Sequence, residues 1–332
     1  MKQWARRSKS LIVAYKIYQN WLMRRRFASG MIESDHGSTH RTKTVAESLN
    51  YIDAQFSDYL TYSGLTEADL HGKRILELGF GDNTGVALKF IAAGAAQIVC
   101  VDKFYSRRSS DQERQIYVAL RGRLNDQERE RFDSAIHIGD GIAFEDQRLR
   151  IINGMDLQQA AASLTKDGAA FDLIISRAVV EEMFDPALVF RAADRLLAPG
   201  GLSVHKIDLS DYGIFSDGGM HPLTFLTISE GIYNRMSTDS GIPNRKLIGY
   251  YRRVMDELGY SSRIFITGVV GRPPLVPHPE QIELGLHYDK NTISLVDEIR
   301  PKLSKEFRDL STEELMINGI FLVAQKPAES KS

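Results

Sequence analysis

The chain has 332 residues, of which 43% are hydrophobic, and a net charge of -1 at pH 7. This composition supports a sizeable buried core and argues against a protein that binds polyanions through its overall charge. The only cysteine, Cys100, lies in an apolar run. A single buried cysteine excludes a disulfide framework and suits a reducing compartment, so we expect a cytoplasmic protein.

Residues 1–30 form a basic and partly apolar segment. They carry eight Lys or Arg residues and no acidic residue, and their apolar run, 11–23, is too short for a membrane-spanning helix, which needs roughly 20 residues. Helical spacing aligns Leu11, Tyr15, Tyr18 and Leu22, with Trp4 and Trp21 as amphipathic anchors. This pattern predicts a helix that lies on the anionic inner face of a membrane, docks on its own domain, or binds a partner.

Residues 1–71 are predicted to form a basic N-terminal helical extension, after which strands and helices alternate. The expected strands are 74–80, 97–102, 149–153, 171–176, 202–208, 263–270 and 319–326, and the expected helices between them are 84–95, 107–133, 157–164, 186–197 and 246–260. This alternation predicts an α/β fold with a mostly parallel sheet and helices on both faces. We expect a substrate cap at 211–260, irregular over 211–245, and a flexible tail at 327–332.

The first of these strands ends in the sequence Gly79-Phe80-Gly81, which disfavours a phosphate site. A dinucleotide fingerprint needs glycine where this chain has Thr84, and no Lys followed by Ser or Thr completes a P-loop. The strand also contains Glu77, whose negative charge would repel a phosphate.

An acid, Asp102, ends the second strand 23 residues after Gly79. An acid at this place can accept hydrogen bonds from both hydroxyls of a ribose, and Glu77 suits a cationic ligand. A ribose and a positive centre without phosphates together describe S-adenosylmethionine. The structural alternative is that Glu77 is a paired core acid and that the glycines only make a tight turn.

Several stretches then carry a resemblance to a known family. The chain resembles the class I S-adenosylmethionine-dependent methyltransferases over residues 72–326, in LELGFGDNTG, VCVDKF, FDLIISRAVVEEMFD, LLAPGG and GIFLVAQK. The resemblance implies a seven-stranded sheet whose last strand runs antiparallel between the fifth and sixth strands. The cofactor-binding residues that it implies are Glu77, Gly79, Gly81 and Asn83 around the methionine part, Asp102 at the ribose, and Lys103 and Phe104 beside it.

The adenine-binding loop should follow the third strand. Chain order places it at Gly154-Met155-Asp156, which makes Met155 and Asp156 candidate cofactor-binding residues. A rival placement is Gly139-Asp140-Gly141.

The catalytic base is left open, because many relatives have Glu-His where this chain has Glu181-Glu182. The candidate catalytic residues are His205 as a base, Asp208 to orient it or to accept a substrate hydroxyl, Glu182 as another base, and Arg177 to hold an anionic substrate. A divalent metal at His205, Asp208, Asp211 and His221 is disfavoured because their spacing matches no recognised motif, so we predict no metal site.

The stretches HKIDLSDYG, GMHPLTFLTIS and PNR resemble methyltransferases that accompany polysaccharide and glycolipid assembly enzymes. This likeness implies O-methylation of a sugar hydroxyl in a glycan, glycolipid or nucleotide sugar, with S-adenosylhomocysteine as the product. One alternative is methylation of a small aromatic or polyketide-like metabolite, and another is a non-catalytic scaffold. Nucleic acid is disfavoured as a partner because no NPPY-type amino-methylating motif is present.

Overall fold

Seven strands form the central sheet, in the spatial order β10-β11-β9-β8-β2-β3-β7. The computed structural model describes residues 8–34, 37–166 and 168–328. The pairs of β2 with β3, β2 with β8 and β3 with β7 are parallel. The sheet strands are β2 (Arg74–Leu78), β3 (Gln97–Asp102), β7 (Leu149–Asn153), β8 (Phe171–Arg177), β9 (Leu197–Asp208), β10 (Ser261–Val269) and β11 (Ile317–Gln325). The predicted seven-stranded, mostly parallel α/β fold is confirmed, including the place of the last strand between the fifth and the sixth.

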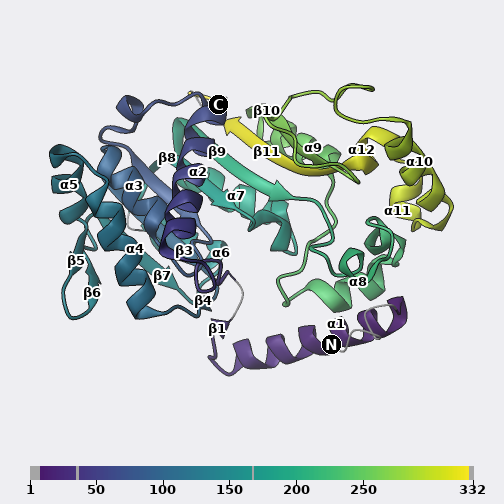
Figure 1. Cartoon of the computed structure of the whole chain (residues 1–332), viewed down its shortest axis with the longest axis horizontal. Coiled ribbons are helices and arrows are strands. Elements are labelled where there is room, and N and C mark those ends of the chain that lie inside the picture. The colour runs from purple at the N-terminus through teal and green to yellow at the C-terminus, as the bar shows by residue number, and fades with distance from the viewer. Residues whose placement is uncertain (1–7, 35–36, 167, 329–332) are drawn as a thin grey trace. The chain divides into compact units, whose positions relative to one another are not determined.

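Helices and two small sheets complete the described chain (Figure 1). Strand β1 (Glu33–Ser34) pairs with β4 (Tyr105–Ser106), and β5 (Ile136–Ile138) with β6 (Ile142–Phe144). The helices are α1 (Lys9–Ala28), α2 (Val45–Ser63), α3 (Gly85–Ala93), α4 (Ser110–Gly122), α5 (Asp126–Asp133), α6 (Leu157–Lys166), α7 (Pro186–Leu196), α8 (Glu230–Ser237), α9 (Ile248–Leu258), α10 (Lys290–Ile299), α11 (Lys305–Arg308) and α12 (Thr312–Met316).

The chain divides into two compact units. Unit 1 comprises Met1–Met31, Ala178–Ala187 and His205–Leu322, and unit 2 comprises Ile32–Arg177, Leu188–Val204 and Val323–Ser332. In unit 2, α2, α3, α4 and α5 pack on one another (Figure 1). In unit 1, α1 packs on α8. The predicted boundaries at residues 71 and 326, and the cap at 211–260, stay predictions.

Strand β2 forms because both of its faces are covered. Ile75 and Leu76 point to opposite faces and are fully buried, while neighbouring parallel strands pair with both edges. The strand stops at Gly79, whose φ of +70° turns the backbone into a conformation that suits glycine. The apolar run and its glycine exit thus place the start of α3 at one end of the sheet.

Three details differ from the sequence predictions. The charged stretch 107–133 forms two helices instead of one, because Asn125 caps a new helix, α5, with a capping box. Residues 211–245, predicted to be irregular, contain the helix α8. Strand β9 begins at Leu197 instead of Leu202, because the backbone of Gly200 and Gly201 hydrogen-bonds with the backbone after β11.

Candidate functional site

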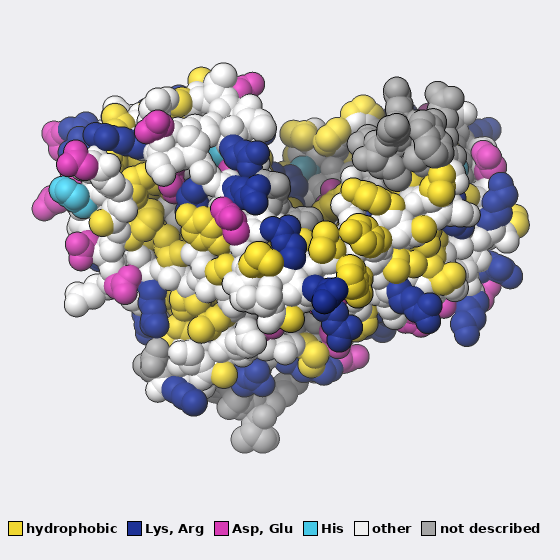
Figure 2. Space-filling view, turned by 90° about the horizontal axis from the view of Figure 1, so that it is seen from below, with side chains coloured by type: hydrophobic (Ala, Val, Ile, Leu, Met, Phe, Trp, Pro, Cys, Tyr) yellow, Lys and Arg dark blue, Asp and Glu magenta, His cyan; other side chains and the backbone are white. Residues whose placement is uncertain are grey.

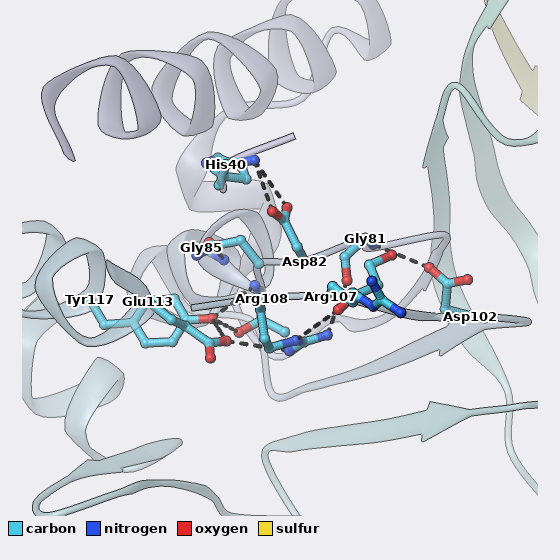
Figure 3. A network of polar contacts seen from close by, with 12 residues as sticks. His40, Gly81, Asp82, Gly85, Asp102, Arg107, Arg108, Glu113 and Tyr117 are labelled. Atoms are coloured by element: carbon cyan, nitrogen blue, oxygen red, sulfur yellow. Dashed lines mark hydrogen bonds and ion pairs between the residues drawn. The ribbon is translucent and has the colours of Figure 1, made fainter. Parts of the chain in front are cut away.

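The predicted cofactor residues after β2 and β3 come together in unit 2. Gly79 and Gly81 both have positive φ, +70° and +65°, and the turn between β2 and α3 brings Gly81 to the end of β3. There the Gly81 N–H donates to Asp102 Oδ2 at 3.2 Å (Figure 3). The Phe104 N–H donates to Asp102 Oδ1 at 3.0 Å. Each carboxylate oxygen keeps a further lone pair for a ribose hydroxyl. Lys103 lies beside this acid, with its ammonium 5.5 Å from the centre of the Phe104 ring.

Two acids of this site hold their protons unusually strongly. Burial raises the pKa of Glu77 to about 7, and Glu77 Oε2 accepts only a weak bond from Cys100 Sγ at 3.5 Å. Burial also raises the pKa of Asp102 to about 6. Burial is the largest cause of both shifts, and a bound positive charge would reverse them. The pair therefore fits a ligand that carries a sulfonium or an ammonium group.

Unpaired buried atoms show where a ligand would complete the site. Asn83 Oδ1 accepts from the Gly85 N–H at 2.7 Å, but Asn83 Nδ2 is buried without a hydrogen-bond partner among the described residues. Asn153 Oδ1 is likewise buried and unpaired. Leaving such a group unpaired costs about 1–3 kcal/mol, so a polar ligand there is favoured. Asn83 Nδ2 is a donor in the glycine turn. Asn153 Oδ1 is an acceptor next to Asp102, which is the partner of Asn153 in the parallel register of β3 and β7.

The two candidate adenine loops lie in different places. The Gly154 N–H donates to the Asp102 carbonyl at 3.0 Å, so Gly154-Met155-Asp156 directly adjoins the predicted ribose site. Met155 is 43% exposed, and Asp156 Oδ1 caps the start of α6 through the Gln159 N–H at 2.9 Å. The rival stretch, 139–141, forms the turn of the small β5–β6 hairpin. This geometry supports the first placement.

A second group of residues, which no sequence pattern indicated, fixes the glycine turn. Arg108 donates to the Gly81 carbonyl at 3.1 Å and forms an ion pair with Glu113 at 3.3 Å (Figure 3). Tyr117, which accepts from the Thr84 N–H at 3.0 Å, also donates to Glu113 at 2.9 Å. Residues of the charged stretch 107–133, which the sequence predicted as one helix, therefore hold the glycine turn in place. These contacts form only when the chain folds, and no sequence motif predicts them.

A separate buried carboxyl occurs in unit 1, on the short 3-10 turn η3 (Val180–Glu182). Glu181 is 1% exposed, and its Oε1 accepts from the Asp208 N–H and from the Tyr212 hydroxyl, both at 2.8 Å. Its Oε2 is buried without a partner among the described residues. Burial raises the pKa of Glu181 to about 7. A carboxyl with an unpaired oxygen and a pKa near neutrality is suited to accept a proton from a ligand.

The PNR stretch that the sequence singled out fixes this turn. Asn244 donates through its side chain to the carbonyls of Val180 and Met183, and through its N–H to the Glu181 carbonyl at 2.7 Å. Arg245 is buried, with its guanidinium 4.0 Å from the centre of the Tyr233 ring. This stretch thus orients Glu181.

The four predicted catalytic residues occupy different environments. His205 is 1% exposed, and burial lowers its pKa to about 3, so it is neutral at pH 7. Asp208 accepts from the Ser210 N–H at 2.8 Å, and Glu182, the neighbour of Glu181, is half-buried. Arg177, in unit 2, pairs with Asp58 at 2.8 Å. Their catalytic roles stay predictions.

The described residues contain no group of three or more His, Cys, Asp and Glu side chains arranged to hold a metal ion.

A parallel sheet whose first strand ends in a glycine turn, beside an acid that ends the next strand, defines a nucleoside-binding α/β domain. The family model described as "Methyltransferase domain" matches residues 50–251, which is more than half of the chain. The chain therefore belongs to this methyltransferase family, and the predicted family is confirmed. A search of curated proteins found no match.

Solved structures with a similar fold include three methyltransferase-related proteins. Phosphoethanolamine N-methyltransferase 2 of Haemonchus contortus, in complex with S-adenosylmethionine, is 15% identical with a TM-score of 0.40; the alignment covers 82% of this chain and 52% of that one. A Mesorhizobium loti S-adenosylmethionine-dependent methyltransferase is 15% identical, with a TM-score of 0.40 and coverages of 83% and 100%. A cyclopropane-fatty-acyl-phospholipid synthase-like protein of Lactobacillus casei is 13% identical, with a TM-score of 0.39 and coverages of 84% and 99%.

The chain spans about half the length of the Haemonchus enzyme. At these identities and TM-scores, the acceptors of the similar proteins have no bearing on the acceptor of this chain.

Proposed function

We propose that this protein transfers a methyl group from S-adenosylmethionine to a sugar hydroxyl in a glycan, glycolipid or nucleotide sugar. The cofactor would lie against the glycine turn, with Asp102 at the ribose and Glu77 near its positive charge. When bound, it supplies an electrophilic methyl group on a sulfonium. The observation that favours a hydroxyl acceptor is the buried carboxyl of Glu181.

Glu181 has the properties of a base for an alcohol. A sugar hydroxyl must lose its proton as it is methylated, whereas a carbanion or a neutral amine depends less on a base. Oε2 of Glu181 would take this proton, while the Tyr212 hydroxyl and the Asp208 N–H hold Oε1. Since the pKa of Glu181 is about 7, the group is about half ionised at neutral pH. We therefore place the proton transfer at Glu181. The predicted residue Glu182 follows it in sequence, the Asp208 N–H donates to its Oε1, and His205 belongs to the same unit.

A pocket of about 180 Å³ in unit 1 is the candidate acceptor site. Its wall carries the polar side chains of Ser210, Asp217 and Asn318 and an aromatic one, Phe225. Ser210 also accepts from the Tyr212 N–H at 3.3 Å, which links this wall to the residue that bonds Glu181. Polar groups beside an aromatic face suit a sugar better than a uniformly apolar metabolite.

Two measurements test this proposal in sequence. Calorimetric titration with S-adenosylmethionine and S-adenosylhomocysteine should show micromolar binding of both, and absence of binding would favour the scaffold alternative. The release of S-adenosylhomocysteine is then measured with nucleotide sugars, lipid-linked glycans, phenolic metabolites and phosphoethanolamine. Turnover with the sugars, and a product heavier by one methyl group, would support the proposal. Turnover only with the phenols would establish the small-metabolite alternative.

We also propose that the protein associates with an anionic membrane surface at the cytoplasmic face, and helix α1 supports this second element of the function. None of the described helices is long and apolar enough to cross a membrane. Instead α1 has two apolar sides. One side docks on α8, where Ile12 is buried and buried Asn20 bonds Thr238 Oγ1 at 2.9 Å and the Asp239 N–H at 2.7 Å. The alternative that this helix docks on its own domain therefore applies to one side of α1.

The opposite side of α1 is exposed and carries large hydrophobic side chains beside basic ones (Figure 2). Tyr18 is 56% exposed and stacks on Trp21, whose other neighbour is the Arg25 guanidinium, 4.8 Å from the ring centre. Aromatic rings beside arginines suit the interface of an anionic bilayer, whereas two copies of such a helix would repel each other. The exposed hydrophobic side chains of α1 are Leu11, Tyr15, Tyr18, Trp21 and Leu22. Trp4 and the basic residues Lys2, Arg6 and Arg7 lie outside the described residues.

Sedimentation with vesicles tests this association. The full chain should bind vesicles that contain phosphatidylglycerol better than vesicles of phosphatidylcholine alone, and salt should weaken the binding. The triple variant Tyr18→Ser, Trp21→Ser, Leu22→Ser should lose it, because its side chains lie away from the docked side. Val118→Ser, which removes an exposed hydrophobic side chain from α4, is the matched control. Equal binding of the triple variant and the wild type would contradict the membrane assignment.

A further inference from the structure

The candidate acceptor pocket of unit 1 is too small for a whole nucleotide sugar. Its volume is about 180 Å³, whereas pockets that enclose drug-sized ligands have roughly 300–1,000 Å³. Leu209, Leu223 and Phe225 supply apolar surface, and Ser210 and Asn318 supply hydrogen-bonding groups. One sugar ring can pack on the apolar side chains and bond its hydroxyls to the polar ones. The rest of the acceptor then lies outside the pocket.

The charge of this pocket disfavours an acceptor whose phosphate groups enter it. Asp211 and Asp217 lie in its wall, and none of the described residues that line it is Lys, Arg or His. Asp211 is 2% exposed, and its carboxylate accepts from the N–H groups of Phe215 and Ser216 at 2.8 and 2.9 Å. Asp217 is exposed. A phosphate here would meet negative charge without a cation to bind it, so the pocket suits an uncharged sugar ring.

Helix α1 contacts the wall of this pocket. Lys9, the first residue of α1, donates from Nζ to Thr227 Oγ1 at 2.5 Å and to the Thr227 carbonyl at 3.4 Å. Thr227 ends the short 3-10 helix η5 (Thr224–Thr227), which also carries the pocket residue Phe225. The basic helix and the pocket therefore meet at a single turn of the chain.

Both α1 and η5 are fixed within unit 1. Arg245, which is 7% exposed, donates to the carbonyls of Phe225 and Ile228 at 3.3 and 2.5 Å. Its guanidinium also lies 5.1 Å from the centre of the Phe307 ring. Helix α1 packs on α8, where its Asn20 is bonded (Figure 1). Because both elements are held in the same unit, the exposed side of α1 keeps a constant position relative to the pocket.

We propose that the methyl acceptor is a sugar carried on a membrane lipid, which reaches the pocket from the lipid surface that α1 binds. The exposed side of α1 would contact the lipid headgroups, with Arg24 and Arg25 next to their negative charge. The pocket would receive only the sugar ring. A nucleotide sugar lacks the lipid and would bring its diphosphate toward Asp217. This inference rests on the proposed function, because it takes a sugar hydroxyl as the acceptor and α1 as the membrane-binding helix.

The turnover of one sugar in three chemical forms tests this assignment in the full-length protein. Glucose, galactose, mannose and N-acetylglucosamine are each presented as a glycosyl dioleoylglycerol in phosphatidylglycerol vesicles, as a methyl glycoside in solution, and as a uridine diphosphate sugar. For the sugar that is methylated, kcat/KM should be at least about tenfold higher for the vesicle-borne form than for the methyl glycoside, because the bilayer concentrates enzyme and acceptor together. The uridine diphosphate sugar should have a lower kcat/KM than the methyl glycoside.

A variant of α1 separates membrane presentation from binding in the pocket. The triple variant Tyr18→Ser, Trp21→Ser, Leu22→Ser should lose at least about tenfold in kcat/KM for the vesicle-borne sugar. Its kcat/KM for the methyl glycoside should stay unchanged, and this also shows that the variant is folded. Val118→Ser, at an exposed position of α4, is the matched control and should change neither value.

The contrary outcomes are distinct from one another. A uridine diphosphate sugar that matches or exceeds the methyl glycoside in kcat/KM would overturn the proposal, as would a vesicle-borne form that gains nothing over the methyl glycoside. Equal losses for both acceptors in the triple variant, or no loss for either, would also overturn it. A wild-type protein that methylates none of the sugars in any form would instead refute the proposed function itself, and this inference with it.

Discussion

Replacing Glu181 with Gln should make the stability of the protein less sensitive to pH. Gln keeps an oxygen that can accept from the Asp208 N–H and the Tyr212 hydroxyl, but it cannot ionise. In the wild type, burial raises the pKa of Glu181 from its ordinary value of 4.5 to about 7. The folded state therefore favours the protonated carboxyl over the ionised one.

The direction of the effect follows from this pKa. Below pH 4.5 the carboxyl is protonated in the folded and unfolded states, so its contribution does not change with pH. Between pH 4.5 and 7 the unfolded state ionises first, and the free energy of unfolding falls as the pH rises. Above pH 7 both states are ionised and the loss is constant. At about 1.4 kcal/mol for each pH unit, the total is about 3 kcal/mol.

Urea unfolding of the wild type and the variant at pH 5, 6, 7 and 8 measures this quantity. From pH 5 to pH 8, the free energy of unfolding of the wild type should fall by about 2–3 kcal/mol relative to that of the variant. Glu77 and Asp102 also have raised pKa values, but they are present in both proteins and cancel. A flat difference for Glu181→Gln would refute the reasoning that burial makes this carboxyl a base near neutrality.

Three further substitutions have expected outcomes. Asp102→Ala should weaken S-adenosylhomocysteine about a hundredfold in calorimetry, because two hydrogen bonds from the ribose to a charge are lost, and an unchanged affinity would remove Asp102 from the site. Gly81→Ala should lower the free energy of unfolding by about 1–3 kcal/mol, since its φ is +65° and the new Cβ would meet the Gly37 carbonyl at 2.6 Å; urea unfolding at the wild-type level would argue against this close approach. His205→Ala should reduce the turnover of methyl acceptor more than the affinity for S-adenosylhomocysteine, but less than Glu181→Gln does, because the proton transfer is placed at Glu181. A larger loss of turnover in His205→Ala than in Glu181→Gln would make His205 the base.

Much of the fold followed from local patterns in the chain. Strand β2 is buried on both faces, so its apolar residues form a continuous run, and the run ends at a glycine that the turn requires. Asp102 could be predicted for the same reason, because it ends an apolar run and strand ends in a parallel sheet meet at one edge. The adenine loop could be placed only by chain order, and the contact between Gly154 and Asp102 supports that placement.

The candidate base, Glu181, could not be identified from such patterns. Glu181 and Glu182 are adjacent and chemically alike, so composition and spacing do not separate them. On a short 3-10 turn, successive side chains point in different directions, and Asn244, more than 60 residues later, fixes which of the two is buried. Burial then raises the pKa of Glu181 to about 7, whereas Glu182 stays half-buried.

The sequence by itself determined the alternation of strands and helices, the glycine turn after β2 and the acid at the end of β3, because each depends on neighbours along the chain. It also determined the basic, aromatic character of α1. Only the tertiary structure decided that Arg108, together with Glu113 and Tyr117 of α4, supports the glycine turn and that residues 37–43 pack against it. Hydrogen bonds between residues distant in sequence need both partners to be brought together by the folded core, and no periodicity in the chain records which pairs will meet.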